Sequence, residues 1–463
     1  MKKLIITNSN KLYRKAIKII PGGSQTFSKG PSQFTNNFAP KYLKKGKGCK
    51  VWDQDNNKYI DYVMGCQPLI LGYADRDVNR AVHKQLEIGS TFSLMNKLEV
   101  DVAELLVKHI PSAEMVRFGK NGGDATTIAI KIARAVTGKQ KIAFCGYHGW
   151  HDWFIASTDK SNGIPDFNKQ LVHSFDYNNI ESLENIFTNN KNEIACVIME
   201  PITVPEPKCF TKSCKDILCK KSNICKKNNF LHKVQQICKK NNALLIFDEV
   251  VTGFRYAIGG AQEYYNVTPD LTALAKGISN GIPLSAIVGK KEYMSLLGDD
   301  VFFSFTYGGE CLGLAAAKAC IKKLIKEKVP KHLNFVGSYY KDSLNKIIKS
   351  HKLEHFLSCD GHPCRSIVTI KNIKNYKNLE IKTFIQQELF RRGILWAAYH
   401  SLSFMHKKSD INKTLKAFDE TLEILGKIIK LNLDIKSKIE GDLVSPVFRK
   451  ISDFNSFIDK KNN

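Results

Sequence analysis

Short apolar runs alternate with helical patterns between about residues 76 and 315, and this alternation constrains the fold more than any other feature. The predicted strands are 115–118, 141–145, 195–199, 243–247 and 286–289. Strands that alternate with helices pair in parallel through crossover connections. The sequence therefore predicts an α/β domain built on a mostly parallel sheet.

The regions on either side of this alternation have different patterns. Residues 1–75 predict an entry helix at 12–19, a glycine turn at 21–23 and a hairpin with strands at 50–53 and 59–62. Residues 316–463 contain long amphipathic helical patterns, one of them with Ser409 as a plausible N-cap. We expect a large domain over 76–315 and a smaller α+β domain from 316–463, to which the segment 1–75 contributes together with part of the active site.

The chain is strongly basic, with 70 Lys and Arg against 44 Asp and Glu among 463 residues, a net charge of +26. The lysines are spread widely, and no aromatic-interleaved RNA motif or basic amphipathic arm accompanies them, which indicates a solvated surface rather than a nucleic-acid or membrane partner. No long uncharged apolar stretch or signal peptide is evident, and thirteen scattered cysteines indicate reduced thiols. We expect a cytoplasmic protein.

Asp248 and Lys276 are the most informative pair of residues. Asp248 follows the apolar run 243–247, and Lys276 lies among small residues in 272–279. Open α/β sheets bind ligands beyond the carboxyl ends of such strands. A partly desolvated lysine has a lowered pKa and attacks carbonyls, and a carboxylate can keep a pyridine nitrogen protonated. Taken singly, Asp248 also fits a helix cap and Lys276 a surface charge, but together they predict pyridoxal phosphate as the cofactor.

A glycine turn follows the strand at 115–118 and precedes a helical pattern. It contains Asn121, Gly122 and Gly123, and the helix that follows ends at Gly138. Backbone N–H groups at a helix start, together with the helix dipole, favour a bound anion. The segment matches neither the nucleoside-triphosphate nor the dinucleotide glycine signature. It predicts a phosphate-binding turn, with a simple glycine turn as the alternative.

Two more strand ends add candidates for the same crevice. Tyr147 follows the strand 141–145, where its ring can stack on a flat heteroaromatic cofactor. Glu200 follows the strand 195–199 and is expected nearby. His148, His151 and Asp152 offer a metal site as an alternative, although a third convincing ligand is lacking.

Several segments in order along the chain resemble class-III pyridoxal-phosphate aminotransferases of fold type I, in the glutamate-1-semialdehyde aminomutase-like branch. They are Leu-Leu-Ile-Phe-Asp-Glu-Val-Val-Thr-Gly-Phe-Arg at 244–255, Ala-Leu-Ala-Lys-Gly-Ile-Ser-Asn-Gly-Ile-Pro at 273–283 and Phe-Thr-Tyr-Gly-Gly-Glu at 305–310. The resemblance implies that Lys276 forms the Schiff base and that Asp248 partners the pyridine nitrogen. The other implied cofactor residues are Tyr147 and Val250 on the two faces of the ring, and Asn121, Gly122 and Gly123 at the phosphate. It also implies that Thr306 reaches the phosphate of a neighbouring subunit, and hence a homodimer with shared active sites.

The chain departs from true aminomutases at a turn near its start. Those enzymes look like Pro-Gly-Gly-Val-Asn-Ser-Pro-Val-Arg, whereas residues 21–29 read Pro-Gly-Gly-Ser-Gln-Thr-Phe-Ser-Lys. Lys29 cannot reproduce the bidentate fork of an arginine on a carboxylate, which argues against the aminomutase substrate. The segments 120–127 and 146–153 instead resemble members of the branch that aminate sugars of bacterial surface polysaccharide.

The expected activity is transfer of an amino group from an amino-acid donor, glutamate, to a carbonyl acceptor, a sugar or sugar acid for polysaccharide biosynthesis. Ser24, Lys29 and His148 are the predicted substrate residues. Two alternatives remain open. One is an isomerase, a glutamate-1-semialdehyde 2,1-aminomutase of tetrapyrrole synthesis that shifts an amino group within one molecule. The other is a basic nucleic-acid or scaffold protein on an inactive enzyme fold.

A cysteine-rich insertion at about 205–230 contains Cys209, Cys214, Cys219 and Cys225. Four thiolates this close could bind structural zinc or an iron–sulfur cluster, although the spacing lacks the C-x2-C knuckle of common zinc sites. The alternative is a surface insertion with free thiols.

Overall fold

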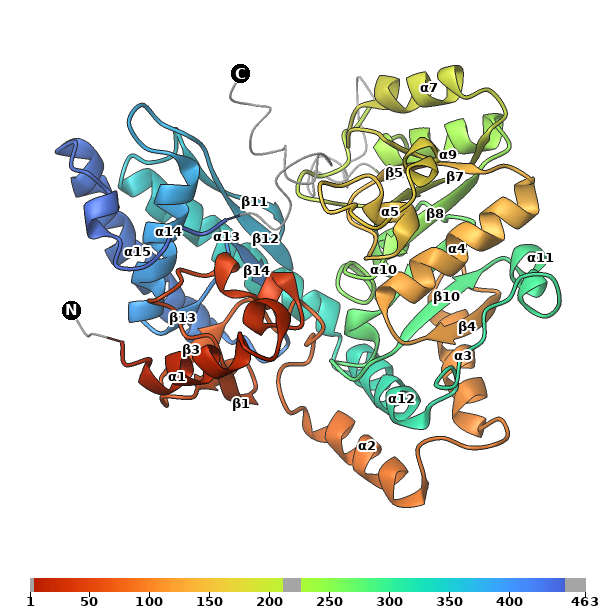
Figure 1. Ribbon diagram of the computed structural model, residues 1–463, viewed down its shortest axis with the longest axis horizontal. Helices are drawn as coiled ribbons and strands as arrows, with labels where there is room; N and C mark the ends of the chain where they lie inside the picture. Colours follow the sequence, from red (N-terminus) through yellow and green to blue (C-terminus); the bar gives the residue numbers. More distant parts are fainter. Residues whose placement is uncertain (1–3, 211–225, 446–463) are drawn as a thin grey trace. The chain divides into compact units, whose positions relative to one another are not determined.

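The computed structural model describes residues 4–210 and 226–445, which divide into two compact units (Figure 1). Unit 1 combines residues 4–75 with 331–445, and unit 2 comprises 76–210 and 226–330. Helix α12 (Cys311–Lys326), which spans the boundary expected at residue 316, belongs wholly to unit 2. In these described ranges, no helix is both long and apolar enough to cross a membrane.

Unit 2 is built on a seven-stranded sheet in the order β4-β10-β9-β8-β7-β5-β6. Its strands are β4 (Met115–Gly119), β5 (Lys141–Cys145), β6 (Val172–Ser174), β7 (Ile194–Met199), β8 (Leu244–Glu249), β9 (Leu271–Leu274) and β10 (Ser285–Gly289). Strands β6, β5, β7, β8 and β9 run parallel, while β10 is antiparallel to both β9 and β4. The mostly parallel sheet is therefore confirmed, whereas β6 and β9 were not foreseen and β10 runs against the expected direction.

Helices connect and cover these strands. They are α2 (Arg76–Ile88), α3 (Lys97–His109), α4 (Gly122–Thr137), α5 (Asp152–Ile155), α6 (Phe167–Gln170), α7 (Ile180–Asn189), α9 (Phe230–Lys240), α10 (Gly260–Tyr265), α11 (Lys291–Met294) and α12, with 3-10 turns η4 (Lys276–Ile278) and η5 (Ser295–Leu297). The apolar face of α4 packs on the sheet (Figure 1), where Ile128 and Ile132 share a buried cluster with Phe144 and Ile246. Gly138 ends α4 at φ 65°, a left-handed conformation that glycine adopts without strain. This packing sets where α4 begins relative to the strand ends.

Unit 1 contains two smaller sheets with helices. The four-stranded sheet, β1-β2-β3-β13, and the three-stranded sheet, β11-β12-β14, are each largely antiparallel, with β13 parallel to β3. The strands are β1 (Leu43–Lys47), β2 (Lys50–Asp53), β3 (Lys58–Asp61), β11 (Leu357–His362), β12 (Arg365–Ile370), β13 (Ile394–Leu395) and β14 (Tyr399–Ser401). The helices are α1 (Thr7–Ala16), α13 (Val329–Ser350), α14 (Asn378–Arg391) and α15 (Lys408–Lys430), with 3-10 turns η1 (Pro21–Gly23), η2 (Phe27–Lys29), η3 (Pro31–Gln33) and η6 (Lys436–Lys438).

Local chemistry explains two of these elements. The predicted hairpin forms between β2 and β3, with Asn56 at φ 68° and the Asp53 carboxylate accepting the N–H groups of Asp55 and Asn57. The predicted N-cap of α15 was wrong, because the cap is Lys407 and Ser409 lies in the first turn. Asp410 Oδ2 accepts the N–H of Lys407 there, so a side chain inside the helix takes over the capping role.

Candidate active site

The carboxyl ends of neighbouring strands bring the predicted cofactor residues to one edge of the unit 2 sheet. In the parallel pair β8–β9, Asp248 is the register partner of Ala273, and Lys276 lies three residues further on. On the other side of β8, Glu200 follows β7, and its N–H donates to the carbonyl of Cys145 at the end of β5 (3.0 Å). Tyr147 and His148 then leave β5 along this same edge.

Asp248 is held firmly, with only 4% of the residue exposed. Its Oδ2 lies 2.8 Å from His148 Nδ1, and its Oδ1 accepts the N–H of Val250 at 3.0 Å. The next residue, Glu249, points to the opposite face of the strand, where its carboxylate accepts N–H groups of Ala261 and Gln262. Two consecutive acids therefore serve different purposes, and only Asp248 belongs to the site edge.

His148 is buried behind Asp248 rather than open to substrate. Because a carboxylate only accepts, the Nδ1–H of His148 donates to Asp248. The ring stacks on Trp153 at 6.1 Å, and the Thr126 hydroxyl donates to the His148 carbonyl at 2.8 Å. Thr127 accepts the indole N–H of Trp153. Two threonines at the start of α4 thus fix the loop that orients the acid.

Tyr147 and Glu200 are linked through the backbone. Glu200 Oε1 accepts the N–H of Tyr147 at 3.0 Å. The pKa of the Tyr147 hydroxyl is raised, mainly by burial and then by the negative charge of Asp248. Because the next residue, His148, bonds to Asp248, Tyr147 lies at the same edge of the sheet as that acid.

The start of α4 fits an anion beside these residues. An added Cβ on Gly122 would lie 2.9 Å from Val250 Cγ1, and one on Gly123 would lie 3.1 Å from the His151 ring. Side chains are therefore excluded where the first N–H groups of α4 emerge, against Val250 and His151. Asn121 donates its N–H to Asp124 Oδ2 at 2.7 Å, which fixes the turn. Pyridoxal phosphate requires an anion site for its phosphate and an acid for its ring nitrogen, and Gly122 at the start of α4 meets Val250, which donates its N–H to Asp248, so the residues present fit this cofactor.

Lys276 has an unusual backbone. Its φ of 46° lies in the left-handed region, which costs a non-glycine residue energy. The residues around it, Ala275 and Gly277–Asn280, are buried, while Lys276 itself is half-buried. The chain is thus bent at the point where β9 ends, and the lysine is the side chain that keeps access to solvent.

Thr306 lies on the segment between β10 and α12 and is exposed. Phe302 and Tyr307 on the same segment are also exposed. Within unit 2, this segment is fastened by Lys131, which donates to the Phe302 carbonyl, and by Arg117, which donates to the Phe303 carbonyl.

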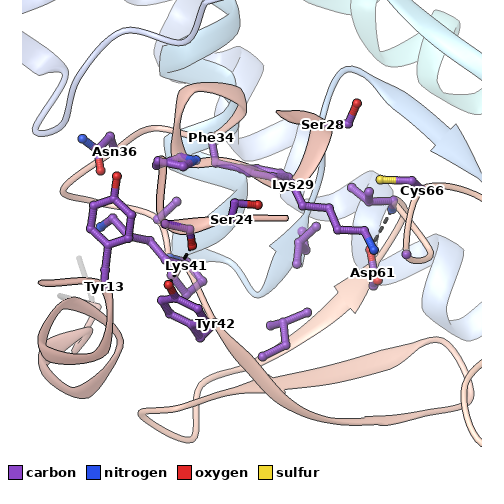
Figure 2. Close-up of a pocket in the computed structure, with 18 of the residues that line it drawn as sticks. Tyr13, Ser24, Ser28, Lys29, Phe34, Asn36, Lys41, Tyr42, Asp61 and Cys66 are labelled. Atoms are coloured by element: carbon purple, nitrogen blue, oxygen red, sulfur yellow. Dashed lines mark hydrogen bonds between the residues drawn. The ribbon is translucent and has the colours of Figure 1, made fainter. Parts of the chain in front are cut away.

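The remaining predicted substrate residues line a cavity of about 360 Å³ inside unit 1. Ser24 and Lys29 come from the turns near the start of the chain, and Figure 2 shows the Lys29 side chain pointing toward Asp61. Asp61 is buried and accepts the hydroxyl of Tyr73 at 2.6 Å and the N–H of Val63 at 2.7 Å. Burial raises the pKa of Asp61. His148, the third predicted substrate residue, belongs to unit 2 and engages Asp248 instead.

Sequence reasoning missed several residues around the site. The bond between His148 and Asp248 and the roles of Thr126 and Thr127 were not foreseen, although the Thr-Thr pair directly after the glycine turn was a usable signal. Ser285, at the start of β10, is fully buried, and among the described residues its hydroxyl has no hydrogen-bond partner. Its Oγ would lie 2.6 Å from a Cβ on Gly119, two residues before Asn121 of the predicted phosphate-binding turn.

The predicted metal site is largely beyond the described part of the chain. Cys214, Cys219 and Cys225 lie outside the described residues, and Cys209 forms an isolated β-bridge with Asn229. Among residues 4–210 and 226–445, no group of three or more His, Cys, Asp or Glu side chains could hold a metal ion. The part of the chain that the structure describes therefore gives no support to a structural metal.

The α/β architecture and the strand-edge site define the class of protein, and the chain belongs to the class-III aminotransferase family, which it matches over residues 34–400. This confirms the predicted family and enzyme class, and it supports pyridoxal phosphate as the cofactor.

Individual relatives have related activities. A 3-aminobutyryl-CoA aminotransferase of Cloacimonas acidaminovorans is 32% identical over 92% of this chain and 99% of its own length. A glutamate-1-semialdehyde 2,1-aminomutase of Wigglesworthia glossinidia brevipalpis is 34% identical over 91% of this chain and 99% of its own. Among solved structures, the FumI protein of Sphingopyxis sp. MTA144 in its PLP internal aldimine form has a TM-score of 0.81 and 25% identity, covering 94% of this chain and all of that one. The fold type I assignment is confirmed by these likenesses.

Proposed function

We propose that this protein is an aminotransferase that moves an amino group from glutamate to a carbonyl acceptor, a sugar or sugar acid used in surface polysaccharide. The observation that carries the proposal is the His148–Asp248 hydrogen bond at the same sheet edge as Lys276. Bound pyridoxal phosphate supplies an electron sink for the carbanion left when the donor loses its α-proton.

The chain's own residues take defined roles in this proposal. Lys276 would hold the cofactor through its aldehyde and, once the donor's amino group has displaced it, its free amine would move the proton from the donor's α-carbon. Asp248, oriented by His148, holds a proton on the cofactor's ring nitrogen. Val250 and Tyr147 enclose the two faces of the ring, with Glu200 fixing the Tyr147 backbone. Asn121, Gly122 and Gly123 bind the phosphate through the N-terminal turn of α4.

The cavity of unit 1 is the proposed recognition site for the acceptor. It carries hydroxyl and amide groups from Ser24, Ser28 and Asn36 that can bind the hydroxyls of a sugar, and Lys29 can attract an acidic group. The Asp61 carboxylate can accept from a further hydroxyl, as it already does from Tyr73.

An intramolecular amino shift is the second candidate, favoured by relatives such as the Wigglesworthia aminomutase at 34% identity. A mutase needs no separate amino donor in each cycle, whereas a transaminase consumes one donor for each acceptor. Lys29, in place of the arginine of true aminomutases, favours the transaminase.

A homodimer is part of the proposal. Large apolar side chains are exposed on unit 2 at Phe92, Leu94, Met95, Phe302 and Tyr307. Exposed apolar side chains in such number favour contact with another protein surface, and Thr306 on the same segment as Phe302 is the residue proposed to serve a neighbouring subunit.

The decisive test is the variant Lys276→Ala together with donor dependence. We expect the wild type to hold a borohydride-trappable cofactor and Lys276→Ala to hold none, because no other amine takes its position. Wild-type enzyme should also require stoichiometric glutamate to aminate a panel of keto and aldehyde sugars. A trapped adduct that persists in Lys276→Ala would overturn the assignment, and turnover of glutamate-1-semialdehyde without added donor would establish the mutase instead.

A further inference from the structure

Lys120 and Glu310 form an ion pair that the proposed function does not use. Lys120 Nζ lies 2.7 Å from Glu310 Oε2, and each side chain is only 16% exposed. Lys120 stands between β4 and the phosphate-binding turn at Asn121, and Glu310 is the N-cap of α12. The pair therefore links the starts of two long helices of unit 2.

Glu310 is anchored on the α12 side. Its Oε1 accepts the N–H of Leu312 at 2.6 Å, and its Oε2 accepts that of Gly313 at 3.1 Å. Burial disfavours its negative charge, but the hydrogen bonds from Lys120 and the two amides outweigh burial, so the pKa of Glu310 is lowered. A Cβ on Gly313 would lie 2.7 Å from the Pro283 carbonyl and 3.4 Å from Lys120 Nζ. The absence of a side chain at Gly313 leaves room for the pair.

Lys120 is anchored on the α4 side through its backbone. Its N–H donates to Asp124 Oδ2 at 2.9 Å, and that oxygen also accepts the N–H of Asn121. The residue before the phosphate-binding turn is thus held from two directions, by Asp124 through its backbone and by Glu310 through its ammonium. Its positive charge is directed to the N-terminal turn of α12 and away from the N–H groups of α4.

We propose that Lys120 and Glu310 are a positioning pair for the phosphate-binding turn. The ion pair fixes the turn so that backbone N–H groups, and not the Lys120 ammonium, bind the cofactor phosphate. This inference rests on the proposed function. In the competing role, the Lys120 ammonium binds the cofactor phosphate directly. Glu310 would then compete for the ammonium and lower the affinity of the protein for the cofactor.

Glu310→Gln separates the two roles, because its amide oxygen can still cap α12 while the charge that holds Lys120 is lost. Apo forms of the wild type, Glu310→Gln and Lys120→Met would be titrated with pyridoxal phosphate and, separately, with pyridoxal, which lacks the phosphate. Tryptophan fluorescence reports binding. The control Lys141→Met removes an ion pair with Glu193 at the amino end of β5, at the opposite edge of the sheet.

We expect Glu310→Gln and Lys120→Met each to weaken pyridoxal phosphate binding roughly tenfold, the value of one charge-assisted hydrogen bond, with pyridoxal affinity unchanged. Lys141→Met should bind as the wild type does. Tighter or unchanged phosphate-cofactor binding by Glu310→Gln would overturn the positioning role, as would an equal loss of pyridoxal affinity. A wild-type protein that binds neither compound would refute the proposed function and not the pair.

Discussion

The two units hold their candidate residues in different ways. At the sheet edge of unit 2, Asp248 and His148 are buried, lie at strand ends and share a 2.8 Å hydrogen bond. In the unit 1 cavity, Ser24 and Lys29 lie on or beside short 3-10 turns, and Lys29 is exposed. The Ser24 hydroxyl makes local bonds, donating to the Thr26 carbonyl and accepting the Thr26 N–H.

This difference matches what each region has to do in the proposed function. A cofactor that stays bound gains from groups fixed before it arrives, because preorganised charge costs no reorganisation during reaction. An acceptor that enters and leaves with each cycle is served by residues on turns, which tolerate sequence change without disturbing a core. We therefore expect unit 2 to determine the chemistry and unit 1 to determine the acceptor.

The largest effect is expected from Asp248→Asn. An amide cannot keep a proton on the cofactor's ring nitrogen, so both half-reactions should slow roughly a hundredfold or more, as when a key electrostatic group is removed from an active site. Rapid-mixing absorbance on adding glutamate, and then an acceptor, measures each half separately. The fold should be intact, because Asn still accepts from the Val250 N–H.

Glu249→Gln is the matched control, since the two acids are adjacent. Its amide would face the N–H groups of Ala261 and Gln262 with one acceptor in place of two, which costs about 2 kcal/mol of unfolding free energy. Half-reaction rates should stay close to wild type. If Glu249→Gln slowed the chemistry as much as Asp248→Asn, the separate roles of the two acids would be refuted.

The sheet edge of unit 2 was largely predictable, and the reason is local. Asp248 ends a run of apolar residues in which every position is buried, and such a run predicts a central strand without knowledge of its neighbours. The two glycines that begin α4 likewise predict a helix start with no room for side chains. Strand β9 was not predicted because it is only four residues long and lacks a run of β-branched residues.

What the sequence did not reveal depends on register and tertiary contact. His148 and Asp248 are 100 positions apart, and they meet only because β7 lies between β5 and β8. The sequence around His148 fits a substrate-binding or metal-binding residue as well as it fits a partner of Asp248. The cavity that joins Lys29 to Asp61 requires turns, a loop and α14 to meet, and no spacing rule predicts that.

Lowering the pH should reduce the stability of unit 1 specifically, and we expect this effect to be intermediate in size. Burial lowers the pKa of His400 to about 3 and that of His406 to about 4. A histidine in the unfolded chain has a pKa of about 6.5. Between roughly pH 6.5 and 4 the unfolded chain therefore binds more protons than the folded one. The free energy of unfolding should fall with decreasing pH, by up to about 1.4 kcal/mol per pH unit for each histidine.

Urea unfolding followed through Trp396 measures this loss, because its indole N–H donates to His400. His406→Gln should reduce the pH slope by about one proton, since glutamine can still accept the Ser403 N–H. His355→Gln, an exposed site in the same unit, should leave the slope unchanged. If the free energy of unfolding had the same pH slope in the wild type, His406→Gln and His355→Gln, the buried histidine would not be the cause of the loss of stability in acid.

The smallest effect, and the one most specific to the comparison, is expected from Lys29→Met. Loss of one exposed charge in the cavity should raise the KM for an acidic acceptor roughly fivefold to tenfold, while the glutamate half-reaction stays within about twofold of wild type. Lys41→Met is the matched control, because Lys41 lines the same cavity but donates to Asn10 and lies over the Tyr13 ring. Its substitution should change acceptor KM by less than about threefold, since its ammonium is already engaged.

The outcome of Lys29→Met tests whether unit 1 determines the acceptor while unit 2 determines the chemistry. A loss confined to the acceptor means that a turn in unit 1 selects the substrate while the chemistry in unit 2 is untouched. An equal slowing of the glutamate half-reaction would mean that Lys29 acts on the cofactor residues as well, and the division would fail. A fall in KM for neutral sugars with a rise for acidic ones would locate the charge preference at this single side chain, because methionine keeps most of lysine's apolar stem and removes its ammonium.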